Sequence, residues 1–223
     1  MQIDSTLDLS PSLDSIQCLD DLASLSSEQL WHLYRHANTP EIEDLEGRLV
    51  GRMLNVPGMD QPAVAKFLNR FAASGRFPWQ GKTFESHGDG TGQGINRVLG
   101  NRRDWFRFDT FIGPSRAGDF DALHLNYDNP GNPGFIRAIK DEVREVAPGI
   151  WLGLAYLRLP GGTYHMALFF ALSNHEHETI TQPQLELSAS SNLNLSKLQK
   201  YAPLLAIPAL LGLFWVFKKK SKK

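Results

Sequence analysis

The sequence contains very little cysteine, and this scarcity excludes several kinds of site. Cys18 is the single cysteine among 223 residues, so the chain can form no internal disulfide and no cysteine-ligated zinc cluster. The chain also lacks a Gly-x-Ser-x-Gly sequence, the turn that presents the nucleophilic serine in many hydrolases. Nucleophilic hydrolase chemistry is therefore not indicated, and the composition fits a reducing compartment.

Excess positive charge is missing from most of the chain. The sequence has 23 Lys and Arg against 24 Asp and Glu, but five of the lysines lie in the last six residues. Without them, 18 basic residues face 24 acidic ones, a net charge of −6. An acidic main part argues against nucleic acid as a partner.

Metal and phosphate patterns are also weak. His32 and His36 lie four residues apart, but the glutamate of the metalloprotease pattern is absent. His175–Glu178 offers two imidazoles without a nearby third ligand. The glycines at 88–94 are followed by a strand pattern and not by a helix, so they indicate a hairpin. We predict no metal site and no cofactor.

One long apolar run is present near the C-terminus. Tyr201 to Phe217 contains no charged residue, and at about 1.5 Å per residue it spans roughly 25 Å, close to a bilayer core of about 30 Å. The run ends in aromatic residues followed by lysines, as expected at a membrane interface. The predicted anchor residues are Tyr201, Trp215, Phe217, Lys218, Lys219 and Lys220.

Two observations predict opposite orientations for this anchor. The positive-inside rule places the lysine-rich tail in the cytoplasm. The first 22 residues are acidic, however, and have neither a basic start nor an apolar stretch, so they do not resemble a signal peptide. We expect a cytosolic globular domain held by a single C-terminal membrane segment. Whether that segment spans the bilayer or lies in its interface stays open.

Composition divides the chain into five segments. Residues 1–26 are rich in Ser, Asp and Leu and are expected to form a flexible leader. A β-rich globular domain is predicted at 27–173, a polar linker at 174–198, the anchor at 199–218 and a basic tail at 219–223.

Strand patterns dominate the globular domain. Leu123, Leu125 and Tyr127 alternate with polar residues, which is typical of a strand with one buried face. Several short strands at similar spacing predict a mainly β (α+β) domain, built as an antiparallel β-barrel or strongly curved sheet with N-terminal helices. The apolar spacing across 135–146 predicts one inserted helix, which would cover the barrel as a lid.

Several motifs carry a resemblance to a known family. They are Gly47–Gly51, the W-x-G-K-x-F sequence Trp79–Phe84, Tyr127-Asp128, Asp141–Val146 and Phe169–Leu172. In this order they resemble bacterial proteins of the GXWXG type with their companion domain of unknown function, over residues 45–172. Leu49 stands where that family has tryptophan. The resemblance implies a compact β-rich fold. A fainter similarity links Trp79–Phe84 to the first strand of lipocalins and fatty-acid-binding proteins.

Three functional hypotheses remain open. In the first, the barrel binds a hydrophobic small molecule or membrane lipid, which needs a cavity of about 300 Å³ or more. Its ligand-binding residues would be Trp79, Phe84, Trp105, Phe108, Tyr127, Trp151 and Tyr156. In the second, an enzyme of isomerase, hydratase or cyclase type uses Asp128, His124 or Glu142 as acid or base. In the third, a non-enzymatic scaffold recruits a partner to the membrane through its acidic surface.

Overall fold

The structure, a computed structural model, describes residues 15–57, 70–73 and 77–174. The predicted linker beyond residue 174, with His175–Glu178, lies outside the described residues, as do the predicted anchor at 199–218 and the tail at 219–223. Across the described ranges, no helix has both the length and the apolar character needed to cross a membrane.

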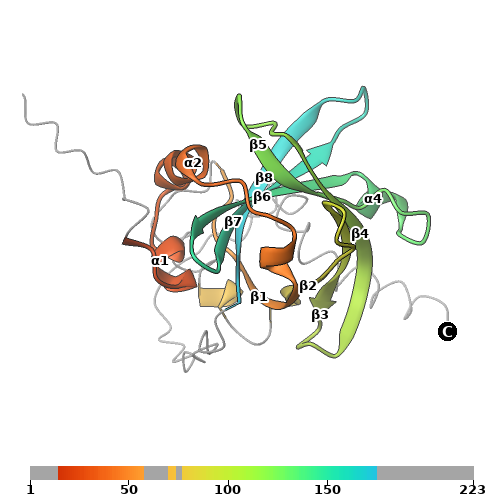
Figure 1. Ribbon diagram of the computed structural model, residues 1–223, viewed down its shortest axis with the longest axis horizontal. Helices are drawn as coiled ribbons and strands as arrows, with labels where there is room; N and C mark the ends of the chain where they lie inside the picture. The colour runs from red at the N-terminus through yellow and green to blue at the C-terminus, as the bar shows by residue number, and fades with distance from the viewer. Residues whose placement is uncertain (1–14, 58–69, 74–76, 175–223) are drawn as a thin grey trace, which may run out of the picture.

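Eight antiparallel strands, hydrogen-bonded in chain order, close into a barrel (Figure 1). Closure comes from β1, which pairs with β2 along one edge and with β8 along the other. The strands are β1 (Gly47–Met53), β2 (Trp79–Ser86), β3 (Thr91–Val98), β4 (Arg103–Pro114), β5 (Asp121–Asn126), β6 (Ile139–Ala147), β7 (Ile150–Arg158) and β8 (Tyr164–Ser173). The predicted mainly β class and antiparallel barrel are confirmed.

Side chains alternate between the barrel interior and its outer face, as strand geometry requires. In β5, Leu123 and Leu125 belong to the interior cluster, while His124 between them faces outward. Large rings fill much of the interior and meet edge to face, for example Phe84 with Phe108 at 5.2 Å between centroids. The aromatic-rich sequence thus builds a core in which most of the space is filled.

The predicted lid helix at 135–146 is wrong. The structure has only the short helix α4 (Gly134–Arg137), and β6 begins two residues later. Ile139 and Val143 fit a helical stripe, but they also share the parity of one strand face. Asp141 and Glu142 looked like a solvated helix surface, yet both are buried on opposite faces of β6.

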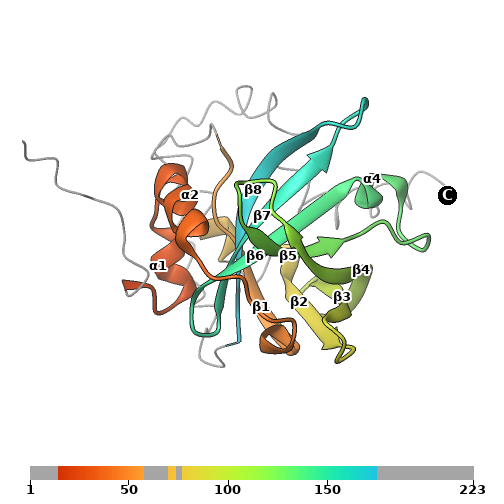
Figure 2. The ribbon, with the colours of Figure 1, turned by 45° about the horizontal axis from the view of Figure 1, so that its top comes forward.

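Two N-terminal helices cover part of the outer wall. Helix α1 (Leu19–Ala23) and helix α2 (Ser27–His36) lie together on one side of the barrel, opposite α4 (Figures 1 and 2). Their buried leucines pack against outward-facing residues of β7 and β8, including Leu152 and Phe169. The leader expected to extend through residue 26 therefore folds onto the barrel from residue 15 onward.

The short helix η2 (Glu43–Leu45) packs against the barrel where β2 ends and β3 begins. Ser86 Oγ donates a hydrogen bond to Glu43 Oε1 at 2.6 Å. Ile42 and Leu45 are buried and join the interior cluster. This end of the barrel is therefore covered.

Gly81 permits the closest approach of β1 and β2. Its φ is +135°, and a Cβ there would lie 2.1 Å from the Leu49 carbonyl oxygen. We expect Gly81→Ala to destabilise the fold by about 2–4 kcal/mol, because backbone atoms must move. Gly88→Ala is the matched control: its φ is +76° in open space, so about 1 kcal/mol is expected. Urea unfolding measures both, and equal losses would contradict the expectation.

Candidate functional site

The barrel interior contains one cluster of buried polar side chains. Its members come from four strands or their ends: Lys82 from β2, Asn96 from β3, Tyr127 just after β5, and Asp141 from β6. A bulge in β2 between Trp79 and Gly81 shifts the register. This shift lets Trp79 and Lys82, three residues apart, both face inward.

Lys82 is fully hydrogen-bonded inside this cluster. Its Nζ donates to Asn96 Oδ1 at 2.9 Å, to Asp141 Oδ2 at 3.2 Å and to the Tyr127 hydroxyl oxygen. Three acceptors match the three N–H groups of an ammonium. Four aromatic rings, including those of Trp79 and Phe170, surround the same nitrogen at 5.2–5.3 Å. Both features favour the charged amine.

Asp141 is only half satisfied. Its Oδ2 accepts hydrogen bonds from Lys82 and from the Tyr127 hydroxyl at 3.0 Å. Its Oδ1 is buried and has no hydrogen-bond partner among the described residues. Asn96, by contrast, uses both ends of its amide: Oδ1 also accepts from Trp79 Nε1, and Nδ2 donates to the Phe106 carbonyl. The free acceptor in this network is therefore Asp141 Oδ1.

A small cavity of about 50 Å³ lies beside this network. Its walls are mainly apolar, with the polar groups of Lys82, Asn96, Tyr127 and Asp141 on them. The other residues lining it are Met53, Trp79, Phe106, Ile136, Ile139, Ala155, Leu168 and Phe170. By volume it holds about three to five water-sized groups.

Burial shifts the pKa of the three ionisable members of the cluster. Desolvation lowers the pKa of Lys82 and raises the pKa of Asp141, and each shift is opposed by the charge of the other residue. Desolvation and the neighbouring Asp141 carboxylate hold the pKa of Tyr127 well above its usual value. Lys82 and Asp141 therefore titrate as a coupled pair, with Tyr127 as a neutral phenol beside them.

A second polar cluster lies on the outer wall, beneath the hairpin that joins β4 to β5. Glu142 is fully buried there. Its Oε1 accepts from Ser115 Oγ at 2.7 Å, and its Oε2 accepts from the Arg116 backbone N–H at 3.1 Å and from Arg116 Nη1 at 3.3 Å. Glu142 therefore fastens this hairpin to the barrel wall.

The structure brings together two of the three predicted acid–base candidates. His124 Nδ1 and Glu142 Oε2 are 3.9 Å apart in the outer cluster. Asp128 lies apart from them and is exposed, with its Oδ1 accepting from Arg137 at 2.7 Å. That hydrogen bond and charge lower the pKa of Asp128. None of the three lines the interior cavity.

The seven predicted ligand-binding aromatics occupy different places. Trp79 and Tyr127 line the interior cavity. Phe84, Phe108 and Trp151 are buried in the interior core, and Trp105 packs against that core while partly exposed. Tyr156 faces outward and packs with the N-terminal helices.

Sequence reasoning missed Lys82, Asn96 and Asp141 as site residues. The signal for Lys82 was present, because a lysine within the apolar W-x-G-K-x-F strand pattern has no obvious route to water. Asp141 was hidden by the helical interpretation of 135–146. Nothing in the sequence singles out Asn96.

Buried tyrosines make the folded protein less stable at alkaline pH. Burial raises the pKa of Tyr34, Tyr127 and Tyr156. An unfolded tyrosine titrates near about pH 10, so stability is full below that value and falls as pH rises toward the folded-state pKa values. We expect three of the five tyrosines to stay protonated at about pH 11 in the folded protein and to ionise on unfolding.

Phenolate absorbance with and without denaturant measures this alkaline behaviour. Titration of all five tyrosines together in the folded protein would contradict the burial of these three rings.

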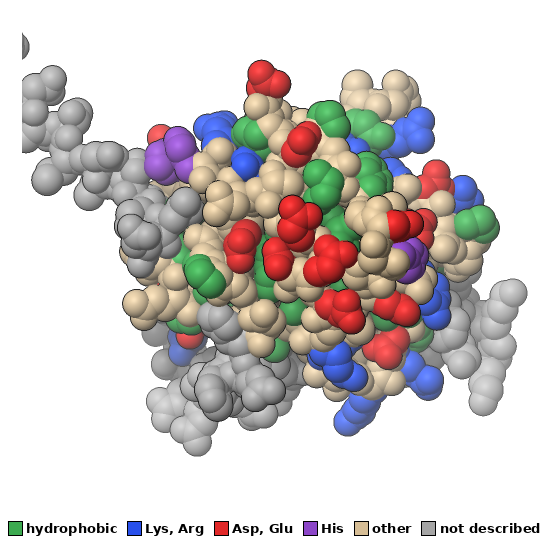
Figure 3. Space-filling model, viewed as in Figure 1, with side chains coloured by type: hydrophobic (Ala, Val, Ile, Leu, Met, Phe, Trp, Pro, Cys, Tyr) green, Lys and Arg blue, Asp and Glu red, His purple; other side chains and the backbone are tan. Residues whose placement is uncertain are grey.

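Acidic side chains gather on one face of the molecule, around η2 and the neighbouring strands (Figure 3). Exposed members include Glu41, Glu43, Asp44 and Glu46. This face agrees with the acidic composition of the main part of the chain.

Comparisons with known proteins identify no family. No family model matches the chain, and no curated protein matches it. A solved structure, the crystal structure of a protein from Thermomonospora curvata, is similar with a TM-score of 0.41 and 14% identity. The match covers 68% of this chain and 88% of that one.

Proposed function

We propose that the barrel binds a small, neutral, mainly apolar molecule that carries a hydroxyl or N–H group, which donates a hydrogen bond to Asp141 Oδ1. The observation that carries this proposal is Asp141 Oδ1 itself, a buried oxygen without a partner among the described residues, in a residue that lines an apolar cavity. A buried carboxylate oxygen is unfavourable unless a donor satisfies it. A ligand hydroxyl would supply that donor.

Charge balance favours a neutral ligand. Lys82 and Asp141 already form a buried ion pair at 3.2 Å, with side-chain exposures of 3% and 6%. A charged ligand would add an uncompensated charge to a low-dielectric interior. An alcohol, amide or similar neutral donor adds none.

The cavity limits the size of the ligand. About 50 Å³ is far below the roughly 300 Å³ that the first hypothesis required, so the structure does not meet that condition and a whole lipid does not fit inside. The bound group is therefore a small molecule, or the polar end of a longer one. In the second case the apolar remainder would extend past Ile136 of α4 and Phe106 of β4, which line the cavity.

The proposal includes membrane attachment through the C-terminal segment. The apolar run and the lysines after it support a single anchor that holds a cytosolic barrel at the bilayer, where apolar ligands concentrate. Resistance of the full chain to carbonate extraction from membranes tests this part. Its release, with the C-terminus intact, would contradict an anchor.

Native mass spectrometry of the full-length chain, followed by organic extraction, tests the binding proposal. We expect a neutral molecule with a hydroxyl or N–H group to co-purify with the wild type. The double variant Lys82→Met, Asp141→Leu should lack it while remaining folded. Arg48→Gln on the exposed side of β1 is the control and should retain it. A wild type that carries only water and binds no neutral alcohol probe would overturn the proposal.

An acid–base enzyme is the second candidate. It is favoured by the direct contact of Lys82, Tyr127 and Asp141, whose ionisations are coupled by burial. Such an enzyme would convert the bound molecule, so the extract would contain two related species. Recovery of one unchanged compound after prolonged incubation would exclude turnover.

A further inference from the structure

A second pocket lies on the outer wall of the barrel, across β6 from the interior cavity. Its volume is about 140 Å³, and it crosses β4, β5 and β6. The residues lining it are Phe111, Arg116, His124, Leu125, Asn126, Lys140 and Asp141. The outward-facing side chains among them supply two cationic groups, an imidazole and an amide.

The two cations have unused hydrogen-bond donors. Arg116 uses Nη1 for its side-chain bonds to Glu142 and His124, which leaves Nη2 and Nε without an acceptor among the described residues. Lys140 Nζ donates to Asn126 Oδ1 and to no other acceptor in the described part of the chain. Several N–H groups therefore remain available to a ligand in the pocket.

Positive charge is in excess around Lys140. Burial lowers the pKa of Lys140, and the positive charges of Arg116, Arg158 and Arg137 lower it further. The negative charge of Asp128 raises it. Asp128 is held by Arg137, and Glu142 already accepts three hydrogen bonds from the hairpin. Glu142 forms an ion pair with Arg116 at 3.3 Å and Asp128 forms one with Arg137, which leaves the Lys140 ammonium without a carboxylate partner among the described residues.

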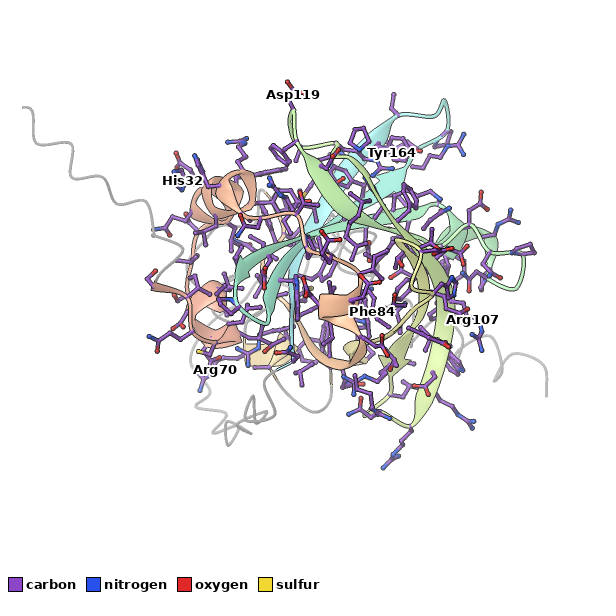
Figure 4. All side chains as sticks on the ribbon, in the orientation of Figure 1. His32, Arg70, Phe84, Arg107, Asp119 and Tyr164 are labelled. Carbon is purple, nitrogen blue, oxygen red and sulfur yellow. The ribbon has the colours of Figure 1, made fainter. Side chains whose placement is uncertain are left out.

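His124 is held in one orientation beside these cations. Its Nε2 lies 3.2 Å and 3.1 Å from the carbonyl oxygens of Gly113 and Pro114, so Nε2 carries the proton. Its Nδ1 then accepts from Arg116 Nη1 at 3.0 Å. The ring also stacks on Phe111 at 5.0 Å, with 14° between the planes. Arg116 is in turn covered by the ring of Tyr164 on β8, whose centroid lies 4.7 Å from the guanidinium carbon (Figure 4 labels Tyr164).

We propose that this outer pocket binds a phosphate group, held by Arg116 and Lys140. A guanidinium and an ammonium with free donors on one concave wall match the oxygens and charge of phosphate. The volume of about 140 Å³ accommodates a phosphate with a small substituent, and the Phe111 ring at the edge offers an apolar contact for that substituent. The outer pocket and the interior cavity lie on opposite sides of β6, and Asp141 lines both.

Inorganic phosphate titrated into the full chain, followed by amide chemical shifts, tests the site. We expect saturable shifts at residues 116, 124–126 and 140. Lys140→Gln should weaken the affinity about tenfold, because it removes a charge-assisted hydrogen bond. Arg48→Gln, which removes a charge elsewhere on the surface, should change it less than about twofold. Shifts spread over the surface, or equal effects of the two variants, would overturn the proposal.

Vesicles separate the two sources of phosphate. Co-sedimentation with vesicles containing phosphatidic acid, reduced by Lys140→Gln but not by Arg48→Gln, would identify a lipid headgroup as the natural source. Binding of free phosphate without any effect of Lys140→Gln on sedimentation would identify a soluble phosphate compound. Either result supports the pocket. The proposal is overturned if Lys140→Gln changes neither phosphate binding nor sedimentation.

Discussion

Lys82→Met should destabilise the protein by about 3–5 kcal/mol, as breaking a buried ion pair does. The substitution leaves Asp141 buried without its cation. It also removes the N–H groups that Lys82 donates to Asn96 Oδ1 and to the Tyr127 hydroxyl oxygen. The double variant Lys82→Met, Asp141→Leu should recover most of this loss, because similar-sized apolar residues can replace a buried pair at little cost. Urea unfolding of the wild type and the three variants, including Asp141→Leu alone, measures the coupling.

The matched control for this cycle is Lys140→Met. Lys140 is an outward-facing lysine of β6, and its Nζ is bonded only to Asn126 among the described residues. A small loss is expected there, below about 1 kcal/mol. Equal losses at Lys82 and Lys140, or additive single losses in the double variant, would contradict a buried interior pair.

Glu142→Gln should destabilise the protein by about 2–4 kcal/mol and loosen the β4–β5 hairpin. The carboxylate is fully buried and accepts from Ser115, the Arg116 backbone and the Arg116 guanidinium. A glutamine has one amide oxygen and an N–H₂ group that would face a donor of the hairpin, so one donor stays unsatisfied. Hydrogen exchange at the Arg116 amide should accelerate along with the fall in stability.

Glu46→Gln provides the control for that change. Glu46 is exposed beside η2, so loss of its charge should leave both the unfolding midpoint and the exchange at Arg116 unaltered. If Glu142→Gln lowered stability without faster exchange at Arg116, the role of Glu142 in holding the hairpin would be disproved.

Strand alternation made the barrel predictable. Leu123, Leu125 and Tyr127 lie inside as their spacing indicates. The helix prediction for 135–146 failed because the apolar residues fit a period of 3.6, whereas on the strand Ile139 and Val143 join the interior cluster and Val146 joins the outer one. Periodicity alone cannot distinguish a helix from a strand when the polar positions are also buried.

The site was less predictable than the fold, for a physical reason. Seven aromatic residues were expected to line a cavity, but packed rings fill most of the barrel interior. Of the seven, Trp79 and Tyr127 line the small cavity that remains. The polar network depends on side chains from four strands that meet only once the barrel closes. Local sequence patterns carry no signal of that meeting.

The difference in affinity between butan-1-ol and methyl propyl ether tests the central claim most directly. The two isomers contain the same atoms, but only the alcohol can donate a hydrogen bond to Asp141 Oδ1. In an NMR titration of the full chain, we predict that the alcohol binds about tenfold more tightly, and that the Lys82→Met, Asp141→Leu variant removes this preference. Equal affinities in the wild type, or a preference that survives in the double variant, would contradict a donor-selective site inside the barrel.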